Sequence, residues 1–206
     1  MGLNIAGLTA LSLVISGSFN ACFAGCMDTD NKLWLTPSNQ SIYDRLMALM
    51  ACPADVDSDT GRQVDAVACN YFVAKGLNDL YGVNDFTSAS NNGIWLTANQ
   101  IADFVRSHPE LWSDLGSASS QQTLADAAAG AAQNQPTIAV MKGDPHGHVA
   151  ILLPGTLEPS TTWALNVPNS AAFSLNNVSK AYVFCRLSAA FSDPSQVEIY
   201  WRVKSQ

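Results

Sequence analysis

The chain is short of positive charge. Its 206 residues include ten Lys and Arg against seventeen Asp and Glu, which gives a net charge of −7. The ten basic residues are scattered along the sequence and form no patch. Because nucleic acids and anionic membrane surfaces attract proteins through basic patches, neither is expected as a partner.

Long apolar runs are missing as well. Residues 5–15 carry no charge, but this run is too short to span a bilayer, so no stable membrane span is expected. The run has the length of a signal-peptide core, and small residues follow it. We therefore expect residues 1–24 to be a signal peptide, cut after Ser18 or Ala24, and the protein to be secreted or periplasmic. A buried N-terminal helix is the alternative.

The sequence contains no CxxC pair, and its five cysteines and three histidines match no zinc pattern. No metal and no organic cofactor are therefore expected. In an oxidising compartment most cysteines should pair. Cleavage after Ser18 would leave all five, so one thiol would remain unpaired, and an odd cysteine in a secreted chain raises the question of a reactive thiol.

Charged residues make up only 13% of the chain and apolar residues 48%, which is a globular composition. No internal repeat and no linker divides the sequence. We therefore expect residues 25–206 to form a single domain.

The first two thirds of the chain carry helical patterns. Apolar residues recur at helical spacing, with Thr97 as an N-cap and with Gly82 and Pro109 as helix ends. The expected helices lie within residues 36–52, 64–82, 95–112 and 119–135.

After Pro136 the pattern changes to short runs rich in β-branched and aromatic residues, separated by turn signals. The expected strands are residues 137–142, 148–153, 161–167, 180–187 and 196–203. Helices first and strands later predict an α+β fold with an antiparallel sheet of about five strands.

Three polar residues occupy chemically suggestive places in this order. Cys69 falls near the first turn of a helix, where the helix dipole can lower the pKa of a thiol. His148 begins a strand, where it can act as general base and acid, and a third group must orient its ring. Asn166, at the end of the next expected strand, is the best candidate. Each residue also has an ordinary reading: half of a disulfide, a ring at a strand edge and a turn residue.

Two motifs in this order resemble a known superfamily. "CNYFVAKGL" (69–77) resembles the nucleophile helix, and "IAVMKGDPHGHVAILLPG" (138–155) the histidine hairpin, of the papain-like NlpC/P60 and CHAP cell-wall amidases. The resemblance covers residues 61–170 and is particularly to the peptidoglycan amidase effectors of type VI secretion. Asn70 and Tyr71 replace the small Ser-Gly pair that is usual beside the nucleophile, so the substrate preference can differ.

The resemblance implies a papain-like NlpC/P60-type fold, with the nucleophile helix packed on the antiparallel sheet. It implies a cysteine amidase or endopeptidase that cleaves an amide bond in the stem peptide of bacterial peptidoglycan, with an antibacterial or wall-remodelling role. Cys69 would be the nucleophile and His148 the general base and acid. The substrate partner would be the stem peptide, and a cognate immunity or inhibitor protein stays open as a second partner.

Several assignments have alternatives. Gln63 lies six residues before Cys69, the spacing of the oxyanion-hole glutamine in papain, and Asp144 could orient His148 in place of Asn166. The same Cys-His pair could serve an acyltransferase or transglutaminase. A non-catalytic secreted module, with Cys69 locked in a disulfide, is the third reading.

Overall fold

The computed structural model describes residues 36–49, 69–88, 94–173 and 181–203. The predicted signal peptide (1–24) and the oxyanion candidate Gln63 lie outside these residues. The described helices are α2 (Gln40–Ala48), α3 (Cys69–Tyr81), α4 (Ala98–Ser107) and α5 (Gln121–Ala132), with two short 3-10 helices, η3 (Leu187–Ala189) and η4 (Pro194–Gln196).

The described strands form one six-stranded antiparallel sheet and two small hairpins. In spatial order the sheet holds β3 (Trp112–Ser117), β10 (Glu198–Arg202), β4 (Thr137–Met141), β5 (His148–Leu152), β8 (Asn169–Ala172) and β9 (Tyr182–Arg186). The hairpins pair β1 (Thr87–Ser88) with β2 (Ile94–Trp95) and β6 (Glu158–Ser160) with β7 (Leu165–Val167). The predicted α+β class is confirmed, with six strands in place of about five.

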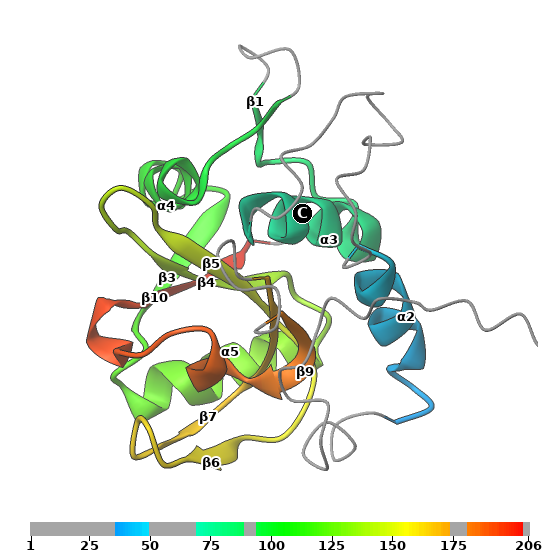
Figure 1. The fold of residues 1–206 in the computed structure, drawn as a ribbon, viewed down its shortest axis with the longest axis vertical. Helices are drawn as coiled ribbons and strands as arrows, with labels where there is room; N and C mark the ends of the chain where they lie inside the picture. The colour runs from blue at the N-terminus through cyan, green and yellow to red at the C-terminus, as the bar shows by residue number, and fades with distance from the viewer. Residues whose placement is uncertain (1–35, 50–68, 89–93, 174–180, 204–206) are drawn as a thin grey trace, which may run out of the picture.

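Helices cover both faces of this sheet (Figure 1). On one face α3 and α4 pack with α2 beside them, and on the other lies α5. The alternation of strand residues divides the core accordingly, because successive side chains point to opposite faces. In β5, Val149 and Ile151 belong to the core under α3, whereas Ala150 and Leu152 belong to the core over α5.

The helix ends follow the local signals in the sequence. The Thr97 hydroxyl accepts a hydrogen bond from the Gln100 N–H, and the Gln100 side chain accepts one from the Thr97 N–H, which makes a complete capping box. Gly82 follows α3 with φ +69°, a left-handed conformation that glycine adopts without strain. Helix α4 ends at Ser107, just before His108 and Pro109. These ends are as predicted.

Strands β3 and β8 of the main sheet were not predicted from the sequence, and one predicted strand lies outside that sheet. Strand β8 has the sequence Asn-Ser-Ala-Ala, which lacks the β-branched and aromatic residues typical of strands. It is buried on both faces and pairs with β5. The strand expected within 161–167 appears as β7, which pairs only with β6, outside the main sheet. The neighbour of β5 is therefore β8 and not β7.

In the part of the chain that the structure describes, no helix combines the length and the apolar character needed to cross a bilayer.

Candidate active site

Cys69 is the first residue of α3 and is 6% exposed. It is the free cysteine among the described residues, whereas Cys185 is disulfide-bonded. The alternative in which Cys69 is half of a disulfide is thereby contradicted. The backbone N–H groups of Val149, Asn70 and Cys69 itself lie near enough to the sulfur to favour its thiolate form.

The electrostatic environment of this thiol differs from the sequence expectation. Burial raises the pKa of Cys69 above its ordinary value, and the three backbone N–H groups lower it by less than burial raises it. The expected lowering by the helix terminus is therefore outweighed by desolvation. At neutral pH the resting side chain is a thiol, and a base must remove its proton before it can attack a carbonyl.

His148 is the first residue of β5 and is partly buried. Its ring meets the ring of Phe191 edge to face, with centroids 5.1 Å apart and an angle of 64° between the planes. Burial lowers the pKa of His148 from 6.5 to about 4. The ring is consequently neutral at pH 7, which is the protonation state a general base requires.

Cys69 and His148 reach β5 from opposite faces. The sulfur lies near the backbone N–H of Val149, and Cys69 belongs to the core under α3, whereas Phe191 belongs to the core over α5. Strand alternation gives the same result, since His148 has the parity of Ala150. Among the described residues, no hydrogen bond joins the sulfur to the His148 ring. Cys69 therefore lies near Val149, the residue after His148, but it is not paired with the His148 ring.

The structure does not bring Asn166 to His148. Its side chain is exposed in β7, and its backbone N–H and C=O both bond to the side chain of Gln121 on α5, at 2.9 Å each. The chain that follows Asn166 runs beside the far end of β5, because the carbonyl of Asn169 accepts a hydrogen bond from the N–H of Leu153, the residue after β5. His148 is five residues before Leu153, about 16 Å away at 3.3 Å per strand residue.

The turn between β4 and β5 holds Asp144, the alternative to Asn166, and a further histidine, His146. Asp144 and His146 are both exposed there, and a cis peptide bond joins Asp144 to Pro145. Neither makes a hydrogen bond or ring contact with His148 among the described residues. A hollow of about 430 Å³ lies elsewhere, between the start of α2, the end of α5 and the 154–156 loop. No titratable side chain lines it, so it adds no catalytic candidate.

Two residues with a direct bearing on this site, Phe191 and Asn99, were not found from the sequence, and Asn70 was noted only for its effect on substrate preference. Phe191 is a single aromatic residue in a polar loop, with no pattern to mark it as the partner of His148. Asn70 and Asn99 are polar residues within amphipathic helices, where an exposed role is the default reading. Only the close approach of α3, α4 and the β4–β5 turn gives the two asparagines their partners.

No cluster of three or more His, Cys, Asp or Glu side chains suited to a metal ion occurs in the described ranges. Protein-family models give no match to the chain, and no curated protein matches it.

Proposed function

We propose that the protein is a cysteine hydrolase that cleaves an amide bond in the stem peptide of bacterial peptidoglycan. Cys69 is the nucleophile, and His148 is the general base and acid. The observation that supports this assignment most directly is the closeness of the Val149 backbone N–H to the sulfur of Cys69. It puts the free thiol at the start of a helix against the residue that follows His148.

The substrate assignment depends on the resemblance of the two motifs at 69–77 and 138–155 to peptidoglycan amidases. In the reaction, His148 takes the thiol proton and the sulfur attacks the amide carbon. His148 then returns the proton to the departing amine, and a water molecule, deprotonated by His148, hydrolyses the thioester. The backbone N–H groups of Cys69 and Asn70 are suited to receive the developing oxyanion.

The resting arrangement requires one movement before this chemistry. The His148 ring has to leave Phe191, and because the strand backbone sets the face on which a side chain lies, the start of β5 has to rearrange to bring the ring to the face that carries Cys69. Substrate bound beside Val149 can favour this rearrangement only by binding more tightly to the rearranged conformation than to the resting one. Catalysis therefore includes a conformational change at the start of β5 that moves the His148 ring.

A secreted or periplasmic location is part of the proposal. Its support is the disulfide at Cys185, since disulfides persist in oxidising compartments. Mass spectrometry of the N-terminus of the exported protein tests this part and identifies the cleavage site.

Digestion of purified peptidoglycan fragments, read by mass spectrometry, tests the reaction. Wild type should release a new amine, while Cys69→Ala and His148→Ala should lose at least about a thousandfold in rate. His108→Ala is the matched control, because the His108 ring stacks on Phe104 at the end of α4 and bonds to its carbonyl. Turnover that survives Cys69→Ala would contradict the proposal.

The same assay separates the alternative reactions. If an added primary amine appears in the product, the thioester is passed to an amine and the protein is an acyltransferase or transglutaminase. No product from folded wild type, with or without the amine, would leave the non-catalytic reading.

A further inference from the structure

The residue after Cys69 is tied to the start of α4. The Asn70 side chain donates a hydrogen bond of 2.9 Å from Nδ2 to the carbonyl of Leu96, twenty-six residues along the chain. Leu96 directly precedes the capping box of Thr97 and Gln100, which fixes the first turn of α4. The beginning of the nucleophile helix is thus held by a rigid part of its neighbour.

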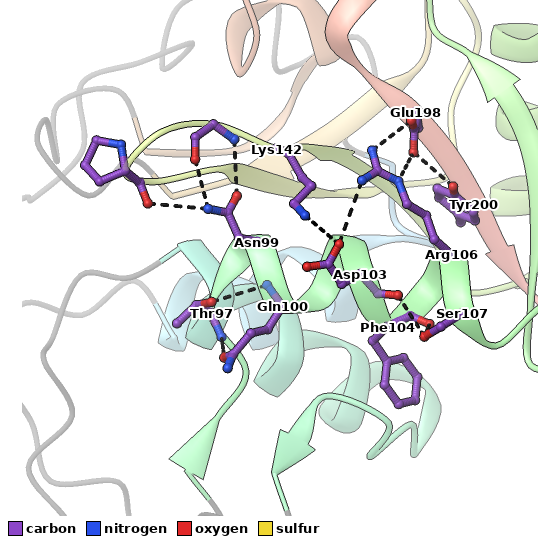
Figure 2. A network of polar contacts seen from close by, with 12 residues as sticks. Thr97, Asn99, Gln100, Asp103, Phe104, Arg106, Ser107, Lys142, Glu198 and Tyr200 are labelled. Atoms are coloured by element: carbon purple, nitrogen blue, oxygen red, sulfur yellow. Dashed lines mark hydrogen bonds and ion pairs between the residues drawn. The ribbon is translucent and has the colours of Figure 1, made fainter.

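The turn before His148 is tied to the same part of α4. The Asn99 side chain donates from Nδ2 to the Gly143 carbonyl at 2.9 Å and to the Pro145 carbonyl at 3.4 Å, and its Oδ1 accepts from the Gly143 N–H at 3.2 Å (Figure 2). One carboxamide therefore satisfies three backbone groups of a turn that has few partners of its own.

Gly147 shows how closely this side chain fits the turn. A Cβ atom at Gly147 would lie 2.4 Å from Asn99 Oδ1 and 2.4 Å from the Met141 carbonyl oxygen, so no larger residue fits without displacement. Gly147 is bonded directly to His148. Asn99 thus contacts the backbone on the N-terminal side of the base candidate, and Asn70, the residue after the nucleophile candidate, is bonded to the Leu96 carbonyl.

Further contacts keep α4 against the sheet along the same side of the helix. Asp103 accepts from the Lys142 ammonium at 2.6 Å, at the end of β4, and Arg106 makes two bonds to Glu198 of β10 at 2.8 and 2.9 Å (Figure 2). Positions 99, 103 and 106 follow the spacing of one helix face. The apolar face of α4 is buried in the core under α3. Helix α4 is therefore a firm support for the turn.

We infer that residues 96–99 set the position of Cys69 relative to His148, with Asn70 and Asn99 as positioning residues. This inference rests on the proposed function. Neither asparagine touches the reacting atoms. Asn70 acts through the first turn of α3, and Asn99 acts through the 142–147 turn.

The test compares Asn99→Ala, Asn99→Asp and Asn70→Ala with wild type in the peptidoglycan digestion assay. Asn99→Ala should lower kcat at least about tenfold with KM within about twofold, because placement of the base affects chemistry and not substrate affinity. Asn99→Asp keeps the size and the acceptor for the Gly143 N–H but loses both donors, so its loss should be intermediate. Asn70→Ala should lower kcat by about as much as Asn99→Ala does, again with little change in KM.

The control is Ser107→Ala at the other end of α4. The Ser107 hydroxyl donates only to carbonyls of its own helix, at Asp103 and Phe104. This variant should keep the wild-type kcat. The double variant Asn70→Ala/Asn99→Ala should lose less than the product of the two single losses, because both act on one geometry.

A kcat within twofold of wild type in folded Asn99→Ala would overturn the inference, as would equal losses in Ser107→Ala. If Asn99→Ala does not fold, Asn99→Asp carries the test. If wild type itself has no activity, the proposed function fails separately. The positioning role is then decided by NMR of the His148 ring and by the alkylation rate of Cys69, both of which Asn99→Asp should change and Ser107→Ala should not.

Discussion

The ring of His148 lies edge to face against the ring of Phe191, 5.1 Å between centroids, on the face of β5 that points away from Cys69. Phe191 is 2% exposed, and its backbone carbonyl accepts a bond from the Trp163 indole N–H at 3.0 Å. The aromatic partner of His148 is thus buried and held by a hydrogen bond at its backbone. In this position the histidine is partly buried and neutral and has no hydrogen-bond partner among the described residues, and three of the following predictions concern that state or the thiol.

Removing the aromatic partner should release the ring. In Phe191→Ala the pKa of His148 should rise from about 4 toward 6.5 by at least about one pH unit, because the lowering comes from burial. The proposed hydrolysis should become severalfold faster, since the ring no longer has to leave Phe191. NMR titration of the ring protons and steady-state kinetics measure the two effects.

Phe191→Leu is the control for this change, because it keeps an apolar side chain over the ring. Its His148 pKa should stay close to that of wild type. An unchanged pKa in a folded Phe191→Ala protein would show that other groups bury the ring. Because a Phe→Ala change in a core costs about 3 to 5 kcal/mol, the measurement is made where circular dichroism shows the variant to be folded.

Stability should fall in mild acid because of His148. Its folded pKa of about 4 lies below the unfolded value near 6.5, so the unfolded chain binds the proton first. The stabilising contribution is complete above about pH 6.5 and is lost as the pH falls toward 4, a total of about 3 kcal/mol. Urea unfolding at several pH values between these limits measures it.

His148→Gln provides the comparison, because glutamine does not titrate. The variant should lose much less stability between about pH 6.5 and 5 than wild type does. Glu198 has a pKa lowered mainly by its hydrogen bonds from Arg106, so its contribution is lost only below the ordinary glutamate range. Equal slopes for wild type and His148→Gln above pH 5 would contradict the assignment.

Alkylation of Cys69 should be slow in the folded protein at neutral pH. Burial raises the pKa of the thiol and limits access, and only the thiolate reacts with iodoacetamide. The rate should increase as the pH rises above about 9, and unfolding in urea should make the reaction fast at pH 8. Mass spectrometry of the peptide that contains Cys69 follows the modification. Fast labelling of the folded protein at pH 7 would contradict the raised pKa.

The ion pair of Asp85 and Arg202 should be a major support for the fold. Asp85 accepts bonds from Arg202 at 2.7 and 3.2 Å and from the indole N–H of Trp112 at 3.0 Å. Both charged side chains are less than a quarter exposed, and Trp112 is fully buried. Asp85→Ala should lower the free energy of unfolding by about 3 kcal/mol, because it leaves a partly buried cation and a buried indole donor unpaired.

The more exposed pair of Arg106 and Glu198 is the matched comparison. Its side chains are 38% and 35% exposed, so Arg106→Ala should cost about 1 kcal/mol or less. Urea unfolding of both variants measures the difference. Equal losses in the free energy of unfolding would show that the deeper burial of Asp85 and Arg202 does not make their ion pair more stabilising than that of Arg106 and Glu198.

The local sequence predicts the helices well. Thr97, Gly82 and Pro109 act on the backbone within one or two turns of themselves, so their effects do not depend on distant residues. The runs that became β4, β5, β9 and β10 were found for a similar reason, because β-branched and aromatic residues favour strands. The strands β3 and β8 carry weaker propensities and form through pairing with their neighbours.

The arrangement of the candidate site depends on contacts between residues that are far apart in the sequence, which local patterns do not predict. The sequence predicts Cys69 near the start of a helix and His148 at the start of a strand, and both are found there. It selects Asn166 on the assumption that the next apolar run is the next strand of the sheet. Because β8 occupies that place, Asn166 lies against Gln121 of α5.

The sequence by itself predicted the α+β class, the helix ends at Thr97, Gly82 and Pro109, and the place of Cys69 near the start of a helix, because these depend on residue type and near neighbours. Only the tertiary structure decided that Cys69 and Phe191 lie on opposite faces of β5. A strand offers both faces alternately, and the packing of α3 on Val149 and of Phe191 on His148 decides which is used. The burial that raises the pKa of Cys69 and lowers that of His148 comes from the same packing.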